Sequence, residues 1–191
     1  MIINSYKEGL KVKELFFKKN VDLVSFAAET IADVFTSGGK LLIIGNGGSA
    51  ADAQHIAAEF VNRFVIERPP LPAIALTTDT SILTCIGNDY SFDQTFSKQV
   101  KALGREGDVL LAISTSGNSS NVLKALKTAT DNGIKTIGLT GRDGGRMAKK
   151  VDVLLNVESD TTARIQEVHI TVCHIICELV DHILFQQAGR Y

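Results

Sequence analysis

Short apolar runs alternate along the chain with longer segments of mixed polarity. Leu41–Ile44 and Val109–Ile113 are apolar at every position, and this pattern predicts strands that are buried on both faces. Further strands, mostly apolar, are expected at 73–76, 136–139 and 151–157. Because these strands alternate with helical segments, we expect an α/β fold, with an open parallel sheet of about five strands and helices on both of its faces.

Apolar residues at helical spacing predict the helices around these strands. Residues 5–36 are expected to form two helices, the second of which ends at Ser37-Gly38-Gly39. Two leading helices can pack on their own sheet or on a partner subunit, and the pattern leaves both arrangements open. A long helix is expected from Thr161 or Thr162 to about Phe185. Further helices are expected over 50–59, 80–86, 91–103 and 121–130.

Size and composition indicate one globular domain over residues 1–191, with 1–38 as a leading helical segment. Hydrophobic residues make up 45% and charged residues 21% of the chain, which is enough apolar content for a sizeable core. The formal net charge of −1 gives no basic footprint for nucleic acid. No apolar run approaches a membrane span or a signal-peptide core, and the three cysteines form no C-x-x-C pair. We therefore expect a cytoplasmic protein.

The first candidate site is the loop Gly45–Ser49, between a buried strand and an alanine-rich helix. Glycine lets a ligand approach the backbone closely, and the N–H groups at a helix N-terminus favour an anion. On that helix His55 and Glu59 are four residues apart, so they share one face. The pattern suits a site for a small polar molecule, although a histidine and a glutamate at this spacing are also common on a solvated helix face.

The second candidate site is the loop 114–120, which is rich in small hydroxyl residues. Ser114, Thr115, Ser116 and Ser119 surround Gly117 at the start of a helix, as in a neutral cradle for a phosphate group. Neither loop has the lysine of a nucleotide-binding P-loop, and neither fits G-x-G-x-x-G. The loops therefore favour a phosphomonoester on a small sugar over a nucleotide; the alternative is a solvated turn.

The last predicted helix carries polar residues among mostly apolar ones. Gln166 and His174 are eight residues apart, about 12 Å along a helix axis, so two subunits could each supply one of them to a site at an interface. His169, Cys173 and Cys177 also share a face of this helix. They are an alternative metal site, but they lack a fourth ligand nearby, and cysteines on an apolar helix are usually small buried hydrophobes.

Several stretches of the chain, in order, resemble the phosphoheptose isomerases, which are sugar isomerase (SIS) domain enzymes of bacterial heptose biosynthesis. They are GNGGSAADAQHIAAE, TTDTSILTCIGNDYSF, GDVLLAISTSGNSSNVLKAL, LTGRDGG and ARIQEVHITVCH, and they span about residues 40–185. The resemblance implies a single SIS domain with a flavodoxin-like fold and a homotetramer with sites at subunit interfaces. It also implies an aldose–ketose isomerase that converts sedoheptulose 7-phosphate to D-glycero-D-manno-heptose 7-phosphate through an enediol.

The resemblance also implies roles for particular residues. It makes Glu59 the general base and His174 the general acid. It implies one zinc ion per subunit, held by His55, Glu59, Gln166 and His174, although glutamine is an unusual zinc ligand. The residues implied to hold the sugar phosphate are Asn46, Gly47, Gly48, Ser49, Glu59, Asn88, Asp89, Ser114, Thr115, Ser116, Ser119 and Gln166.

Two other functions stand beside the isomerase. NRFVIERPPLPAIALTTD and ELVDHILFQ are similar to the branch of the family that associates with the replication initiator DnaA and is not known as an isomerase. That branch lacks the glutamate and the histidine at the positions of Glu59 and His174, so their presence here favours the isomerase. A sugar-phosphate-sensing regulator is the third function, but it usually carries a DNA-binding module for which this chain has no room.

Overall fold

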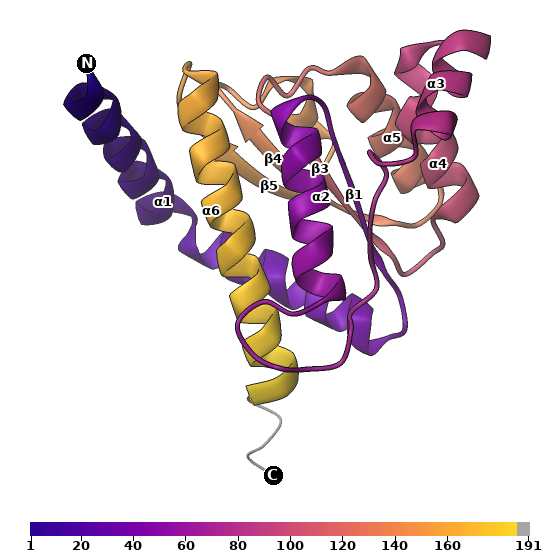
Figure 1. The fold of residues 1–191 in the computed structure, drawn as a ribbon, viewed down its shortest axis with the longest axis horizontal. Helices are drawn as coiled ribbons and strands as arrows, with labels where there is room; N and C mark the ends of the chain where they lie inside the picture. Colours follow the sequence, from indigo (N-terminus) through magenta and orange to yellow (C-terminus); the bar gives the residue numbers. More distant parts are fainter. Residues whose placement is uncertain (187–191) are drawn as a thin grey trace.

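The computed structural model describes residues 1–186, which fold as alternating helices and strands (Figure 1). In chain order the elements are α1 (Ile2–Thr36), β1 (Leu41–Gly45), α2 (Gly48–Val61), β2 (Ala73–Ala75), α3 (Thr80–Asp89), η1 (Phe92–Gln94), α4 (Thr95–Leu103), β3 (Val109–Ser114), α5 (Ser120–Asp131), β4 (Lys135–Gly141), η2 (Gly145–Lys149), β5 (Val153–Val157), α6 (Thr162–Asp181) and η3 (His182–Gln186).

The five strands form one open sheet in the order β2-β1-β3-β4-β5, and all of its neighbouring strands are parallel. In register, Leu41 lies opposite both Ala73 and Val109, and Ile137 lies opposite Val153. This is the flavodoxin-like strand order, whose switch point lies between β1 and β3. The expected α/β fold with a parallel sheet is confirmed.

Two apolar clusters cover the two faces of the sheet. Strand residues whose side chains point to one face of the sheet, such as Ile43 and Leu111, pack with α1, α2 and α6. Strand residues that point to the other face, such as Leu42 and Leu110, pack with α4, α5 and η2. The central strands β1 and β3 are buried at every position, which explains their continuous apolar runs, whereas the edge strands β2 and β5 alternate between buried and more exposed residues. Figure 1 shows α6 and α2 lying together in front of the sheet.

The expectation of two leading helices is wrong, because residues 2–36 form the single helix α1. Lys18, Lys19 and Asn20 interrupt the apolar pattern, but none of them is a proline or glycine that would break a helix. The amide of Asn20 donates a hydrogen bond of 2.8 Å to the carbonyl of Phe16, one turn earlier in α1. The polar segment is therefore an exposed part of one long helix.

Other boundaries differ from expectation by smaller amounts. Helix α2 begins at Gly48, inside the predicted glycine loop, and the segment 91–103 is a short 3-10 turn followed by α4. The carboxylate of Asp79 caps α3 as expected, by accepting from the N–H of Ile82 at 2.9 Å. That helix continues through Asp89 instead of ending before it.

The segment Thr162–Gln186 is long and apolar enough, by length and composition alone, to cross a membrane. In this fold Val168, Val172 and Val180 of the segment are fully buried in the cluster shared with α1, α2 and the sheet. The apolar face of α6 is therefore part of the protein core.

Candidate active site

The two candidate loops lie side by side at the carboxyl edge of the sheet. They follow β1 and β3, which are adjacent strands, so α2 and α5 both begin at this edge. Ligands of open parallel sheets bind there, at the switch point between the strands. Gly47 has a φ of +56°, a conformation that favours glycine at the turn into α2.

Three side chains from two helices converge farther along α2, in its second half. Nε2 of His55 lies 3.0 Å from Oε1 of Glu59, one turn along α2. Nε2 of His174, on α6, lies 3.4 Å from Nε2 of His55, and the ring of Phe64 stacks on the His174 ring. The contact between α2 and α6 thus places a carboxylate and two imidazoles together within one chain, so Glu59 and His174 do not need a second subunit to meet.

The geometry of this cluster fits a metal ion. The ligand atoms of His55, Glu59 and His174 all lie within 4.8 Å of one another. Ligand atoms around a tetrahedral zinc, at bond lengths of about 2.0–2.1 Å, are about 3.3 Å apart. The two measured separations of 3.0 and 3.4 Å lie close to that value. Two nitrogens and one oxygen are also a donor set that zinc accepts, so these residues can hold a divalent cation.

The cluster is open to solvent in the single chain. The side chain of His55 is 46% exposed and that of Glu59 is 24% exposed. A site that transfers protons to and from carbon needs to exclude water, which this degree of exposure does not achieve.

Asp52 is a fourth polar group beside the cluster, and the sequence analysis missed it. It lies one turn before His55 on the same face of α2, and its Oδ2 is buried without a hydrogen-bond partner among residues 1–186. Burial raises the pKa of Asp52, and the nearby imidazoles of His55 and His174 act in the opposite direction. The spacing of 52, 55 and 59 at i, i+3 and i+7 is the signal that could have identified it.

The hydroxyl loop after β3 has the arrangement expected of a phosphate cradle. The hydroxyls of Ser114 and Ser119 lie 3.0 Å apart, at the end of β3 and the N-cap of α5. Thr115 and Ser116 lie between them and are half-buried. The hydroxyl groups and the free N–H groups of the first turn of α5 thus gather at one place.

An amide pair joins the two loops. The side chains of Asn46, after β1, and Asn121, in the first turn of α5, exchange two hydrogen bonds of 2.9 Å. Asn121 was not among the predicted site residues, although its place directly after the serines of the loop was a usable signal. Ser49, in the first turn of α2, is buried.

Gln166 lies against the start of α2. A Cβ added to Gly48 would lie 2.4 Å from Nε2 of Gln166, so any larger residue there would have to displace this amide. The structure therefore places Gln166 beside the glycine loop, at the N-terminal end of α2, whereas His55 and Glu59 lie farther along that helix.

Asn88 and Asp89 are not brought to the cluster within this chain. They lie on the exposed end of α3, where the amide of Asn88 donates a 2.8 Å hydrogen bond to the carboxylate of Asp89.

The alternative metal site at His169, Cys173 and Cys177 does not form. Nε2 of the buried His169 donates to the carbonyl of Thr140 at 2.9 Å. Both cysteines are buried, and burial raises the pKa of each thiol, which disfavours the thiolate that binds metals. These residues are part of the protein core.

Comparison with known proteins finds relatives over nearly the whole chain. The SIS domain family matches residues 6–141. The phosphoheptose isomerase of Nitratidesulfovibrio vulgaris (strain Hildenborough) is 59% identical over 186 residues, which cover 97% of this chain and 89% of that protein. The match thus extends over both helices that carry the cluster.

Two solved structures share the fold closely. Phosphoheptose isomerase GmhA from Neisseria gonorrhoeae is 51% identical with a TM-score of 0.89, and a phosphoheptose isomerase from Francisella tularensis is 43% identical with a TM-score of 0.91. Each alignment covers 94% of this chain and 96% of the other. These relatives give no support to the alternative of an adaptor for DnaA. The chain belongs to the SIS-domain family and, within it, to the phosphoheptose isomerases.

Proposed function

We propose that the protein is an aldose–ketose isomerase, an intramolecular oxidoreductase that converts sedoheptulose 7-phosphate to D-glycero-D-manno-heptose 7-phosphate. The identity of its relatives supports this activity. The observation that carries the proposal is the convergence of the Glu59 carboxylate and the imidazoles of His55 and His174 where α2 packs on α6.

The reaction needs one base and one acid at adjacent carbons. In the proposed mechanism Glu59 removes a proton from C1 of the ketose, while His174 donates a proton to the oxygen on C2, and an enediol results. The proton then returns to C2 as O1 gives up its own proton, which leaves an aldehyde at C1. No electrons leave the sugar, so the residues need no redox partner.

The hydroxyl loop is the proposed phosphate site. Ser114, Thr115, Ser116 and Ser119 would donate hydrogen bonds to the phosphate oxygens, together with backbone N–H groups at the start of α5. The binding set would be completed by Asn46, Gly47, Gly48, Ser49, Glu59, Asn88, Asp89 and Gln166. Phosphate binding far from C1 and C2 would anchor the chain of the sugar, so that its reacting end lies at Glu59.

His55, Glu59 and His174 would hold a zinc ion, with Gln166 as the further ligand implied by the family. The fit of their donor atoms to a tetrahedral edge supports this assignment. When bound, the ion would polarise the oxygens of the sugar and so favour the enediol.

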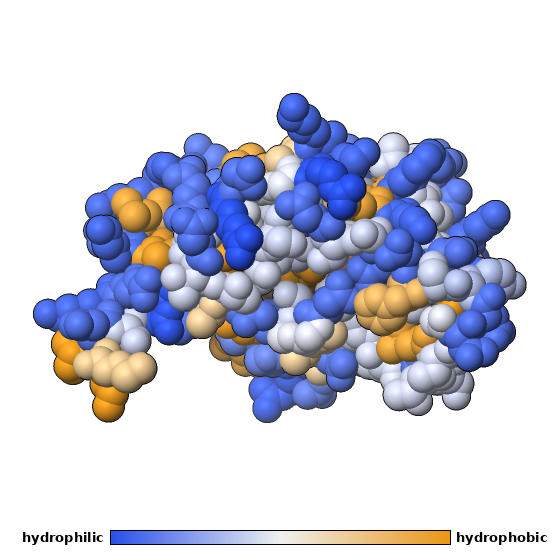
Figure 2. All heavy atoms as spheres, turned by 90° about the horizontal axis from the view of Figure 1, so that it is seen from above, coloured by the Kyte–Doolittle hydropathy of each residue, from blue (hydrophilic) through white to orange (hydrophobic). Residues whose placement is uncertain are grey.

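We further propose that the chain is a single SIS domain that assembles as a homotetramer in the cytoplasm, with its sites at subunit interfaces. Helix α1 exposes several apolar side chains along its length, among them Tyr6, Leu10, Leu23 and Phe26. Figure 2 shows hydrophobic atoms gathered at the protruding end of the molecule where Figure 1 places the N-terminus. A neighbouring subunit on this surface would cover apolar area, and assembly could bring Asn88 and Asp89 of one subunit to the open cluster of another.

The test is incubation of the purified protein with sedoheptulose 7-phosphate, with and without a metal chelator. We expect an aldose heptose 7-phosphate to accumulate, and we expect the chelator to slow its formation. Absence of product, with and without added zinc, would refute the proposed activity.

A further inference from the structure

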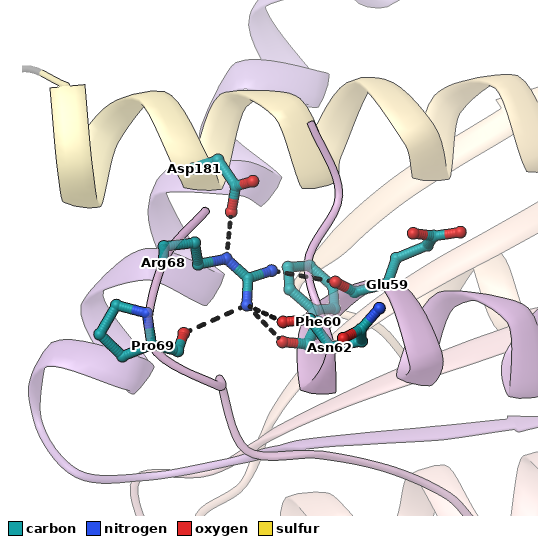
Figure 3. A network of polar contacts seen from close by, with 6 residues as sticks. All are labelled: Glu59, Phe60, Asn62, Arg68, Pro69 and Asp181. Atoms are coloured by element: carbon teal, nitrogen blue, oxygen red, sulfur yellow. Dashed lines mark hydrogen bonds and ion pairs between the residues drawn. The ribbon is translucent and has the colours of Figure 1, made fainter. Parts of the chain in front are cut away.

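A buried arginine lies beneath the site, on the segment that follows α2. The side chain of Arg68 is only 1% exposed, and its Nε donates to Oδ1 of Asp181 at 2.8 Å. Asp181, at the end of α6, has a side chain that is 4% exposed. The pair is therefore almost completely removed from water (Figure 3).

The same guanidinium caps the C-terminal end of α2. Its Nη2 donates to the carbonyl of Glu59 at 2.9 Å, and its Nη1 donates to the carbonyl of Phe60 at 2.6 Å. Longer contacts reach the carbonyls of Asn62 and Pro69. The last carbonyls of a helix lack intrahelical partners and carry partial negative charge, so a cation is favourable there. Figure 3 shows the carbonyl of Glu59 facing Arg68 while its carboxylate points away.

Arg68 thus joins the two helices that carry the reactive groups. One of its partners is the backbone of Glu59 itself, and Asp181 lies seven residues after His174, on the same face of α6. The planar fork of a guanidinium fixes direction as well as distance, which the point charge of a lysine does not. The contacts of Arg68 therefore fix the position of Glu59 relative to the helix that carries His174.

Stability alone does not account for this pair. Well-packed apolar residues often replace a buried ion pair without loss of stability, because desolvation offsets much of its attraction. Oδ2 of Asp181 also has no hydrogen-bond partner in the part of the chain that the structure describes, which is unfavourable.

We propose that Arg68, held by Asp181, is a positioning residue of the isomerase, which sets the separation of Glu59 and His174 without touching the substrate. This inference rests on the proposed function for its kinetic test, and on geometry alone for its structural test. The predicted effect is on kcat, because the proposed phosphate site lies on the loop after β3, away from Arg68.

The informative variant is Arg68→Met/Asp181→Leu, which removes both charges and leaves neither buried alone. We expect its Tm to fall by several degrees, because the carbonyls of Glu59 and Phe60 lose their buried donor. We expect kcat to fall by about 10- to 100-fold with little change in KM, because small displacements of a catalytic group have effects of this size. A kcat equal to wild type in the folded double variant would overturn the proposal.

Arg68→Lys extends the test if the double variant does not fold. Lysine keeps the charge but cannot make all the contacts of the fork, so kcat should fall while KM stays near wild type. The matched control is Lys40→Met, which removes a partly buried ion pair of 2.7 Å with Asp108, between the residues that precede β1 and β3. This control should lower Tm and keep kcat; an equal loss of kcat in the control would show that Arg68 acts through stability alone.

A crystal structure of the double variant separates the two proposals. We expect Glu59 to move relative to His174 by more than about 0.5 Å, the tolerance of a catalytic site. An unchanged separation would overturn the positioning role whether or not the protein isomerises the sugar. A displaced Glu59 in a protein whose wild type forms no aldose would instead refute the proposed function alone.

Discussion

At the residue level, the proposed activity depends on the group of His55, Glu59 and His174. Glu59 contacts His55 and lies close to His174, so one carboxylate is available both to a base role and to a metal. The bound sugar would decide between these uses, because C1 must come within hydrogen-bond reach of the base.

Replacing Glu59 with glutamine tests the base directly. Glu59→Gln keeps the size and a hydrogen-bonding oxygen but removes the basic carboxylate. We expect kcat to fall by about 100-fold or more, because general bases contribute this much. The measurement is steady-state turnover alongside the circular dichroism spectrum. A folded variant with wild-type kcat would remove Glu59 from the base role.

Gly48 tests the placement of Gln166. In Gly48→Ala the new methyl group would lie 2.4 Å from Nε2 of Gln166 and displace it, while alanine suits the helix. We expect kcat/KM to fall at least about tenfold, because a mispositioned group loses catalysis steeply, with no loss of Tm. Gly87→Ala is the control, since nothing lies within 4 Å of its added carbon. Equal kcat/KM in both variants would show that Gln166 has no role.

The sequence alone identified residues that stand in short local motifs better than residues whose role depends on contacts with distant parts of the chain. The glycines, hydroxyls and the pair of His55 and Glu59 are visible because they stand in short local motifs. Arg68 and Asp181 are 113 residues apart, and no local pattern reveals their contact. Asp52 was missed because only the packing of α6 on α2 shows that its carboxylate is buried.

Elements were predicted well wherever both faces are buried. The runs of β1 and β3 are apolar because helices cover both sides of these central strands, so the pattern alone located them. The leading helix was split in two because its middle carries exposed polar residues, which a surface helix tolerates. Whether exposed residues end a helix or lie on its outer face depends on tertiary packing.

The packing of α6 on β4 predicts an effect of pH on stability. Burial lowers the pKa of His169 from 6.5 to about 4. Between pH 6.5 and 4, His169 is protonated in the unfolded chain but neutral in the folded chain. The free energy of unfolding therefore falls as the pH drops from 6.5 to 4, and this residue does not affect it above pH 6.5.

His169→Gln removes this titration and can still donate to Thr140. The free energy of unfolding of wild type should fall by on the order of 3 kcal/mol more than that of the variant between pH 6.5 and 4. Urea titrations at several pH values measure this difference. Parallel pH profiles for the two proteins would contradict the buried neutral state of His169.

At the scale of the whole molecule, the single chain leaves its cluster partly exposed and several apolar side chains of α1 open to solvent. Both features are accounted for by assembly, which is the proposed homotetramer. The sequence left open whether the leading segment packs on its own sheet or on a partner subunit. In the structure α1 packs on α6 and also exposes apolar side chains that a partner could cover.

Phe26→Glu tests this assembly. The side chain is 54% exposed on α1, so a charge is tolerated in the single chain but not in an apolar interface. We expect light scattering to report a smaller particle. We also expect kcat to be at least about tenfold lower, because the site would stay exposed to water. Lys101→Glu, on the exposed side of α4, is the control. An unchanged tetramer, or full activity in a dissociated variant, would contradict the interface.

The most direct measurement is the position of hydrogen exchange in the product. When wild type converts sedoheptulose 7-phosphate in heavy water, proton transfer through an enediol places deuterium on C2 of the aldose, and NMR detects it there. We predict deuterium at C2 with wild type and none above background with Glu59→Gln. Equal labelling and turnover by both proteins would contradict the role of Glu59 as the general base and with it the proposed mechanism.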